Sequence, residues 1–298
     1  MIVQRFLIQP SAIWIFLGIA AAAIGQTSTP QQPPQTAVSP APAQTQTTTL
    51  PEIGPDQSWS FELFYWLTQA NPDQKTGAAA TDFETLGSLG KSKPAPGAEL
   101  SLRLTSNDVL RVSVFQMHGN GTTTASQALD LFTTAIAAGD YLATTYTISA
   151  AKVSFEDLLY PFPVKGRKLR FKTLWELQAA KIYSRVDAPF DTSLVASSGA
   201  GVFPSATGQH YVVLPAFGGA IQSAATQNLY MELRGSGFGI PHHQDTLDAE
   251  GSISYRIGQV QIVAGGKLYK FKTSPQSTEY FTGMITGGYV GLRWVGTR

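Results

Sequence analysis

Short segments that alternate apolar and polar residues recur along the chain from Trp59 onward. The clearest covers residues 169–183, where Phe171, Trp175 and Leu177 fall on one face and charged residues fall on the other. Successive side chains of a β-strand point to opposite faces, so a period of two indicates strands whose faces meet different surroundings. The pattern predicts an all-β protein.

Repetition of this pattern predicts ten strands, with boundaries good to a few residues. The alternation is weakest at 141–149 and 210–222, so eight or twelve strands remain open. The ten expected strands lie near residues 59–68, 98–105, 109–117, 141–157, 167–185, 210–222, 226–237, 246–257, 259–271 and 279–295.

The connections between these segments alternate in length. Tight turns at 106–108 and 258 alternate with long connections, which cover residues 70–97, 118–140 and 186–209. Outer-membrane barrels have short periplasmic turns and longer outer loops. We therefore expect an antiparallel up-and-down transmembrane β-barrel in the outer membrane, and an even strand number puts both barrel termini on the periplasmic side.

One long connection contains apolar residues at helical spacing. Thr124 or Ser126 is a candidate N-cap, and Gly139 is a candidate stop. The spacing predicts one short amphipathic loop helix, packed on the barrel rim rather than gating the lumen. Its apolar positions are Ala128, Leu129, Leu131, Phe132, Ala135 and Ile136.

Alternation alone does not say which face points outward, because a soluble lipocalin-like barrel turns its apolar residues inward. Two features favour a membrane barrel. The apolar face consists of Leu, Val and Ile with Ala and Gly, while the polar face carries both signs of charge. Aromatic residues also gather near strand ends, as interfacial girdles do, namely Trp59, Tyr65, Trp66, Tyr183, Tyr280, Phe281 and Trp294.

The polar face is then expected to line the lumen. A ten-stranded barrel has a narrow interior, and an unpaired ion in a dry interior is costly, so opposed charges there are expected to pair and close the lumen. The expected network has seven acids and nine bases: Glu62, Glu99, Arg103, Arg111, Lys152, Glu156, Arg170, Lys172, Glu176, Glu232, Arg234, Asp248, Glu250, Arg256, Lys267 and Arg293.

The N-terminal region is typical of an exported protein. Arg5 precedes an apolar run at 12–24, and small residues offer a cleavage site, so residues 1–25 are interpreted as a signal peptide. An uncleaved anchor is the alternative, but the run is shorter than the roughly 20 residues that a spanning helix needs. Residues 26–56, rich in Pro, Gln and Thr, are expected to form a disordered periplasmic linker before the barrel at 57–298.

Composition and motifs narrow the function classes. With a net charge of +1, the chain lacks the excess of positive charge that is typical of nucleic-acid-binding proteins. The absence of cysteine excludes thiolate chemistry and lipid acylation of cysteine. His242, His243 and Asp245 are metal-ligating residue types, but adjacent histidines in a turn rarely aim at one ion. The sequence has no nucleophile motif, so we expect no cofactor, no metal and no enzymatic activity.

Three segments resemble a known group of proteins. They read KLRFKTLWELQAAKIYSRVDAPF (168–190), GSGFGIPHHQDTLDAEGSISYRIGQVQIVAGGKLYKFKTSP (235–275) and EYFTGMITGGYVGLRW (279–294). In these stretches the chain resembles uncharacterised outer-membrane β-barrel proteins of acidobacteria. The resemblance implies the same fold and location, and it transfers no catalytic or binding residues.

Together these patterns predict an integral outer-membrane barrel with an occluded, ion-paired lumen. Its role is expected to be structural, adhesive or narrow transport, through long outer loops. A barrel enzyme acting on outer-membrane lipid and a soluble periplasmic lipid-binding barrel are the alternatives. The expected partners are outer-membrane lipid and the barrel assembly machinery, and the sequence specifies no ligand.

Overall fold

The computed structural model describes most of the chain after the predicted linker. The predicted signal peptide (1–25) and linker (26–56) lie outside the described residues, and so does 191–203 in one long connection. The described ranges are 57–70, 72–76, 84–132, 134–164, 167–190, 204–226, 228–241, 243–274 and 279–297.

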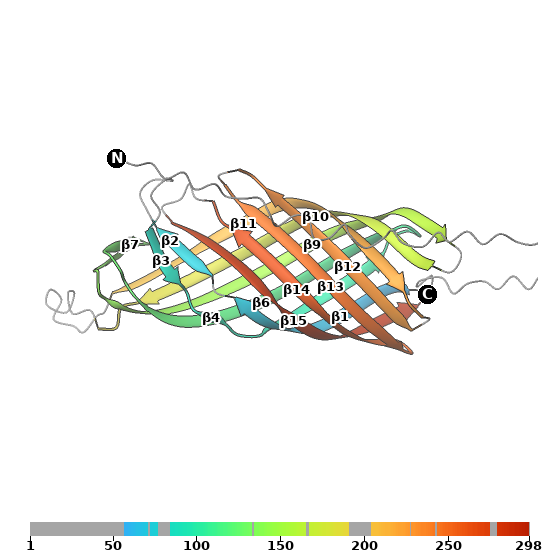
Figure 1. Cartoon of the computed structure of the whole chain (residues 1–298), viewed down its shortest axis with the longest axis horizontal. Helices are drawn as coiled ribbons and strands as arrows, with labels where there is room; N and C mark the ends of the chain where they lie inside the picture. The colour runs from blue at the N-terminus through green and yellow to red at the C-terminus, as the bar shows by residue number, and fades with distance from the viewer. Residues whose placement is uncertain are drawn as a thin grey trace, which may run out of the picture. The chain divides into compact units, whose positions relative to one another are not determined.

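Ten long antiparallel strands close into a barrel in the described part of the chain (Figure 1). Each strand pairs with the next along the chain, and the last pairs with the first. The strands are β1 (Gln57–Ala70), β5 (Ala95–Arg103), β6 (Asp108–Thr124), β9 (Tyr141–Val164), β10 (Arg167–Asp187), β11 (Ser205–Ala224), β12 (Leu229–Gly239), β13 (Asp245–Ile257), β14 (Val260–Lys272) and β15 (Glu279–Thr297). The predicted ten-stranded all-β barrel is confirmed, and the alternatives of eight and twelve strands are excluded.

Several strands are longer than the sequence pattern predicts. β9 has 24 residues and β10 has 21, whereas about 9–11 residues suffice to cross a bilayer. β6 was expected to end near residue 117 but continues to Thr124, because polar residues on its outer face still pair with β9. The connection expected at 118–140 is therefore shorter, covering residues 125–140.

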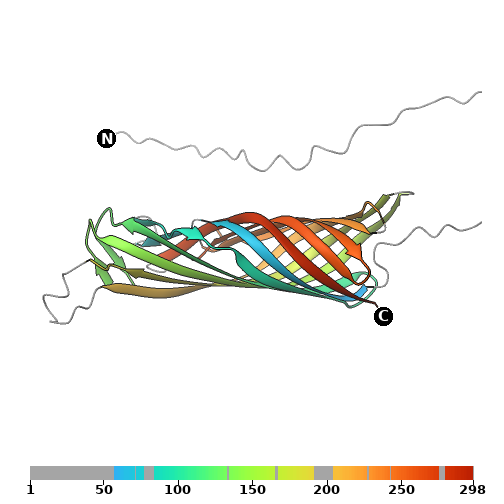
Figure 2. The same cartoon turned by 90° about the horizontal axis from the view of Figure 1, so that it is seen from below.

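Short turns join the strands at the end where β1 begins and β15 ends, here called the short-turn end (Figure 2). In the β5–β6 turn the Thr105 hydroxyl accepts hydrogen bonds from the N–H groups of Asn107 and Asp108. In the β11–β12 turn the Thr226 hydroxyl accepts hydrogen bonds from the N–H groups of Asn228 and Leu229. Between β13 and β14 the turn contains Gly258 with a φ of +63°, a conformation that glycine adopts without strain.

Among the described residues, five short strands lie at the opposite end, here called the long-loop end, and Figure 1 labels four of them. They are β2 (Asp73–Thr76), β3 (Glu84–Ser88), β4 (Lys91–Ser92), β7 (Leu129–Leu131) and β8 (Thr134–Ile136). β2 pairs with β15 and with β3, and β4 pairs with β6, so the connection after β1 is joined to the barrel wall.

The predicted loop helix at 128–136 is wrong, because this segment forms the β7–β8 hairpin. The spacing of the apolar residues in this segment also fits two short strands, of which β7 buries Leu131 and β8 buries Ile136. A hydrogen bond from the N–H of Ala125 to the carbonyl oxygen of Asp140 (2.9 Å) closes the base of the segment and favours a hairpin. The described residues contain no helix that is long and apolar enough to cross a membrane.

Candidate functional site in the barrel interior

Neighbouring residues have opposite exposure in the part of the wall nearer the short-turn end. On β10 Trp175 and Leu177 are 57% and 53% exposed, whereas Glu176 between them is 6% exposed. Apolar side chains therefore cover the outside, and charged side chains face the interior. Soluble monomers rarely expose a continuous apolar surface of this extent. The apolar belt includes Phe61, Leu63, Leu67, Leu100, Leu102, Val114, Val153, Phe155, Trp175, Leu177, Phe217, Ile221, Met231, Leu233, Ile253, Ile262, Val290 and Leu292.

The aromatic residues expected at the membrane interfaces divide into two groups. Trp66 and Phe281 are buried in the barrel interior, and Tyr280 is buried beneath Lys75 and Lys272, so the prediction that these three belong to interfacial girdles is wrong. Trp66 directly follows the outward Tyr65, and the alternation of the strand turns it inward. The four that lie on the outside are Trp59, Tyr65, Tyr183 and Trp294.

Charged side chains inside the barrel form one connected network around Arg111 and Arg234 and two separate pairs, Lys267–Glu250 and Arg293–Glu62, here together called the ion-paired layer. Its side chains come from β1, β5, β6, β9, β10, β12, β13, β14 and β15. The members are Glu62, Glu99, Arg111, Lys152, Glu156, Lys172, Glu176, Glu232, Arg234, Asp248, Glu250, Lys267 and Arg293.

Arg111 lies at the centre of this layer. Its guanidinium nitrogens contact carboxylate oxygens of Glu99 at 2.6 Å, Glu156 at 2.6 Å and Glu232 at 3.2 Å. The contact from Nε to Glu156 is close but poorly aligned as a hydrogen bond. Arg111 and Glu156 are both buried, so removal of either takes a close opposite charge from the other in a poorly solvated interior.

A second arginine connects the same carboxylates to the far side of the lumen. Arg234 on β12 lies 3.3 Å from Glu176, 3.4 Å from Glu156 and 3.9 Å from Glu99. Lys152 continues the connection, because its Nζ lies 2.9 Å from Asp248. Strands that are distant in the barrel order are thus joined through its interior.

The remaining ion pairs lie between neighbouring or nearby strands. Lys172 donates to Glu156 at 2.8 Å, Lys267 lies 3.6 Å from Glu250, and Arg293 lies 2.7 Å from Glu62. Every member of the ion-paired layer was named from the alternation of the sequence.

Uncharged polar residues complete the layer, and the sequence analysis missed them. Glu176 accepts hydrogen bonds from the hydroxyls of Ser154 and Ser236 and from the Gln178 amide. The Tyr289 hydroxyl donates to Glu250 at 2.6 Å. These residues occupy inward positions of the same period-two pattern, so a search for all inward polar residues would have included the serines and the glutamine.

Three predicted lumen bases lie nearer the short-turn end than the ion-paired layer does. Arg256 donates from Nε to the carbonyl oxygen of Gly258 at 2.9 Å. Arg103 and Arg170 line a cavity of about 130 Å³, here called the vestibule. Arg111 and Lys172 of the ion-paired layer line the same cavity, so the layer forms part of its boundary.

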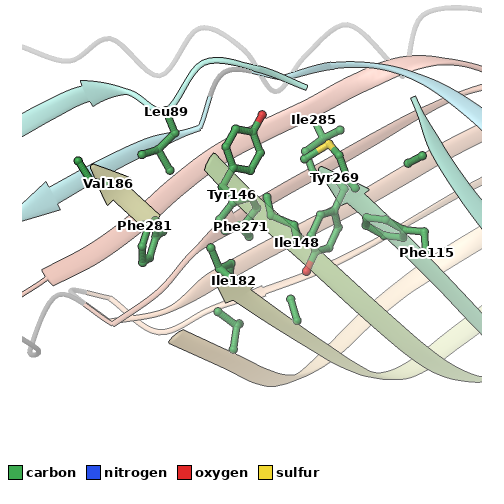
Figure 3. Packing of buried hydrophobic residues seen from close by; sticks show 14 of the residues in the cluster. Leu89, Phe115, Tyr146, Ile148, Ile182, Val186, Tyr269, Phe271, Phe281 and Ile285 are labelled. Carbon is green, nitrogen blue, oxygen red and sulfur yellow. The ribbon is translucent and has the colours of Figure 1, made fainter. Parts of the chain in front are cut away.

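Apolar side chains fill the interior on the long-loop side of the ion-paired layer. Figure 3 shows side chains from three strands packed there, Phe115 of β6, Tyr146 and Ile148 of β9, and Tyr269 and Phe271 of β14. This apolar layer includes Phe64, Trp66, Leu89, Phe115, Met117, Leu142, Tyr146, Ile148, Ile182, Val186, Val212, Leu214, Tyr269, Phe271, Phe281, Ile285 and Tyr289.

Lys267 lies where the two layers meet. Its Nζ lies 5.4 Å from the ring centre of Phe64, 5.8 Å from that of Trp66 and 5.7 Å from that of Phe115. An ammonium group at such distances is attracted to the negative faces of the rings. The same Nζ reaches Glu250, so one side chain contacts both layers.

The connection after β3 contributes to the apolar layer. Leu89 is buried there, and its carbonyl oxygen accepts a hydrogen bond from the Thr144 hydroxyl at 2.7 Å. The Tyr146 hydroxyl donates to the carbonyl oxygen of Gly90 at 3.2 Å. Gly90 has a φ of +98°, and a Cβ there would lie 2.3 Å from the carbonyl oxygen of Asn120. Glycine is therefore required for this close approach.

The candidate metal ligands are not brought together by the described residues. His242 lies outside them, and Asp245 pairs with Lys270 at 3.6 Å. The backbone N–H of His243 donates to the carbonyl oxygen of Ile240. Within the described ranges there is no group of three or more potential metal ligands.

Comparison with known proteins gives a likeness of fold. No family model and no curated protein matches the chain. The outer membrane protease OmpT from Escherichia coli is similar in structure, with 7% sequence identity and a TM-score of 0.52, over 81% of this chain and 97% of that chain. The attachment invasion locus protein Ail of Yersinia pestis matches at 8% identity and a TM-score of 0.36, over 80% and 99% of the two chains. The chain has the fold of an outer-membrane β-barrel.

Proposed function

We propose that this protein is an integral outer-membrane β-barrel whose lumen is closed at rest, and that it serves a structural or adhesive role through its long-loop end. The observation that carries the proposal is the ion-paired layer, whose members contact one another across the lumen. A general pore needs a continuous aqueous path, and buried ion pairs at these distances leave no such path at their level.

The apolar belt supports placement in a membrane. Its residues face outward on consecutive strands, and the charged residues between them face inward. A bilayer is the medium that stabilises this arrangement, because a closed barrel satisfies its backbone hydrogen bonds internally and presents apolar side chains to lipid. By the usual arrangement of short periplasmic turns, the short-turn end and both barrel termini face the periplasm.

Outer-membrane lipid and the barrel assembly machinery are the proposed partners. Lipid contacts the apolar belt directly. The assembly machinery is required by the proposed location, since the strands must enter the membrane from the periplasmic side. Fractionation tests the location: the protein should sediment with the outer membrane and be released by detergent, whereas release by salt alone would contradict the proposal.

Two barriers in series keep the lumen closed in this proposal. The ion-paired layer blocks passage by direct contacts, and the apolar layer excludes water from the interior beyond it. A substitution in one layer leaves the other in place. Opening the barrel should therefore require changes in both layers.

Conductance across a planar bilayer tests this proposal. The purified wild-type protein should show no large, continuously open current. Truncation of Arg111, Lys172 and Glu176 of the ion-paired layer together with Arg170 of the adjoining cavity should destabilise the barrel or weaken the first barrier. Truncation of Trp66, Tyr269 and Phe271 should weaken only the second. Folded protein that combines both sets should conduct. A steady, porin-sized current from the unmodified protein would refute the closed lumen.

A further inference from the structure

The vestibule has an uneven charge. Among the residues that line it, five carry positive charge and one carries negative charge. The negative residue is Glu232, and the positive residues are Arg103, Arg111, Arg170, Lys172 and Arg293. The positive residues come from β5, β6, β10 and β15, so they surround the cavity from several sides of the barrel.

Carboxylates in the ion-paired layer fix the orientation of the buried positive residues. Lys172 is held by Glu156 at 2.8 Å, and Arg293 is held by Glu62 at 2.7 Å. Neither Glu156 nor Glu62 lines the vestibule. An ammonium group has three N–H donors and a guanidinium has five, so one carboxylate partner leaves donors for a further acceptor.

Hydroxyl groups add uncharged donors to the same wall. Six serines line the vestibule, namely Ser58, Ser60, Ser101, Ser223, Ser252 and Ser254. Several donors around one small space suit a ligand that presents several acceptor oxygens. Arginine matches the paired oxygens of phosphate particularly well, because its planar fork can make two parallel hydrogen bonds.

The size of the cavity limits the ligand. Its volume of about 130 Å³ is below the roughly 300 Å³ at which sites for organic ligands of ordinary size begin. A small ion or a single anionic group of a larger molecule fits this limit.

We propose that the vestibule binds a tetrahedral oxyanion of the phosphate type, either free or as a headgroup presented at the short-turn end. Arg103 and Arg170 contribute positive charge near the opening, while Arg111 and Lys172 form the inner wall. This binding does not depend on whether the barrel conducts, so failure of the closed-lumen proposal would leave it standing.

Calorimetric titration with inorganic phosphate tests the site in the full-length protein, held in phosphatidylcholine nanodiscs at constant ionic strength. The wild-type protein should bind phosphate saturably. The double variant Arg103→Gln/Arg170→Gln should bind about tenfold more weakly or worse, because each substitution removes charge-assisted hydrogen bonds. Circular dichroism should show that the double variant keeps its β-structure.

Arg185→Gln is the matched control. Arg185 lies on β10 near the long-loop end, where its side chain is 52% exposed and pairs with Asp187. This variant should bind phosphate as the wild type does. Absence of saturable binding to the wild type would overturn the proposal, and so would equal weakening in the control and the double variant, which would indicate a general charge effect.

A second arm separates the two sources of the anion. Phosphatidic acid is added to the nanodiscs, and the phosphate titration is repeated. Competition between the lipid and inorganic phosphate would support a headgroup ligand, and unchanged phosphate affinity would support the free ion. Both outcomes agree with an oxyanion site in the vestibule.

Discussion

Strand β6 has opposite polarity at its two ends. Near the short-turn end Val114 is outward and 45% exposed, while Arg111 and Ser113 are buried inside. Farther along the same strand Met117 is buried inside, while Gln116 and the following outward residues are polar and exposed. The period of two is unbroken, but the apolar residues move from the outer face to the inner face.

Strand β10 shows the same reversal. Trp175 and Leu177 lie outside and Glu176 lies inside, whereas farther along Ile182 is inside and Lys181 is outside. We call the first region the membrane half and the second the loop half. In the proposed membrane setting, the membrane half has lipid outside and ion pairs inside. The loop half is organised like a water-soluble barrel, with a packed apolar interior.

This comparison explains why the strands exceed the length needed to cross a bilayer. The alternation persists in both halves because each half has two unlike surroundings, and the backbone pairing is indifferent to which side is apolar. The position along a strand at which the apolar residues move from the outer face to the inner face therefore marks the level at which the strand leaves the lipid.

The largest expected effect comes from the interior of the membrane half. Arg111→Met leaves Glu99, Glu156 and Glu232 without their shared cation, so the free energy of unfolding should fall by about 3–5 kcal/mol. Urea titration of the protein folded in lipid vesicles measures the loss. Arg256→Met is the control, since Arg256 bonds a backbone carbonyl in the exposed β13–β14 turn. Equal losses in the two variants would argue against the special role of the ion-paired layer.

Much of the fold was predictable from the sequence, because alternation depends only on strand geometry and on two unlike surroundings. The same reasoning placed Arg111, Glu156 and Arg234 on the inner face. Which carboxylate each base contacts was not predictable, since several of these contacts, such as that of Lys152 with Asp248, join strands that are not neighbours in the barrel. Glu176 and Arg234, for instance, are 3.3 Å apart only because β10 and β12 curve toward each other around the lumen.

The errors in the sequence analysis have a common cause. Trp66 and Phe281 were assigned to the membrane interface on the assumption that one polarity holds along every strand. They belong to the apolar layer, where that polarity is reversed. The segment 128–136 was assigned to a helix because its apolar spacing fits both a helix and two short strands. Only the pairing of β7 with β8 distinguishes the two structures.

The second prediction concerns the outer face. Leu177→Arg places a charge in the apolar belt and should lower the free energy of unfolding in lipid vesicles by about 2–4 kcal/mol if the position is near the bilayer midplane. Leu102→Arg and Val112→Arg should lower it as well, by less where the residue lies near an interface. Thr122→Arg, on the exposed outer face of the loop half, should fold as the wild type does. If substitution at Leu177, Leu102 and Val112 had no effect, the outward assignment would be wrong.

The smallest expected effect separates packing against protein from packing against lipid. Ile148 is fully buried in the apolar layer, and Ile148→Val should lower the free energy of unfolding by about 0.5–1.5 kcal/mol because the neighbouring side chains fill the lost volume only in part. Ile253 lies on the outer face of β13 and is 49% exposed. Ile253→Val should cost much less, since lipid tails are as apolar as the side chain and move into the space that the lost methylene leaves. Urea titration of both variants in the same vesicles measures the difference, and equal losses would mean that the outer surface of the membrane half is packed against protein rather than lipid.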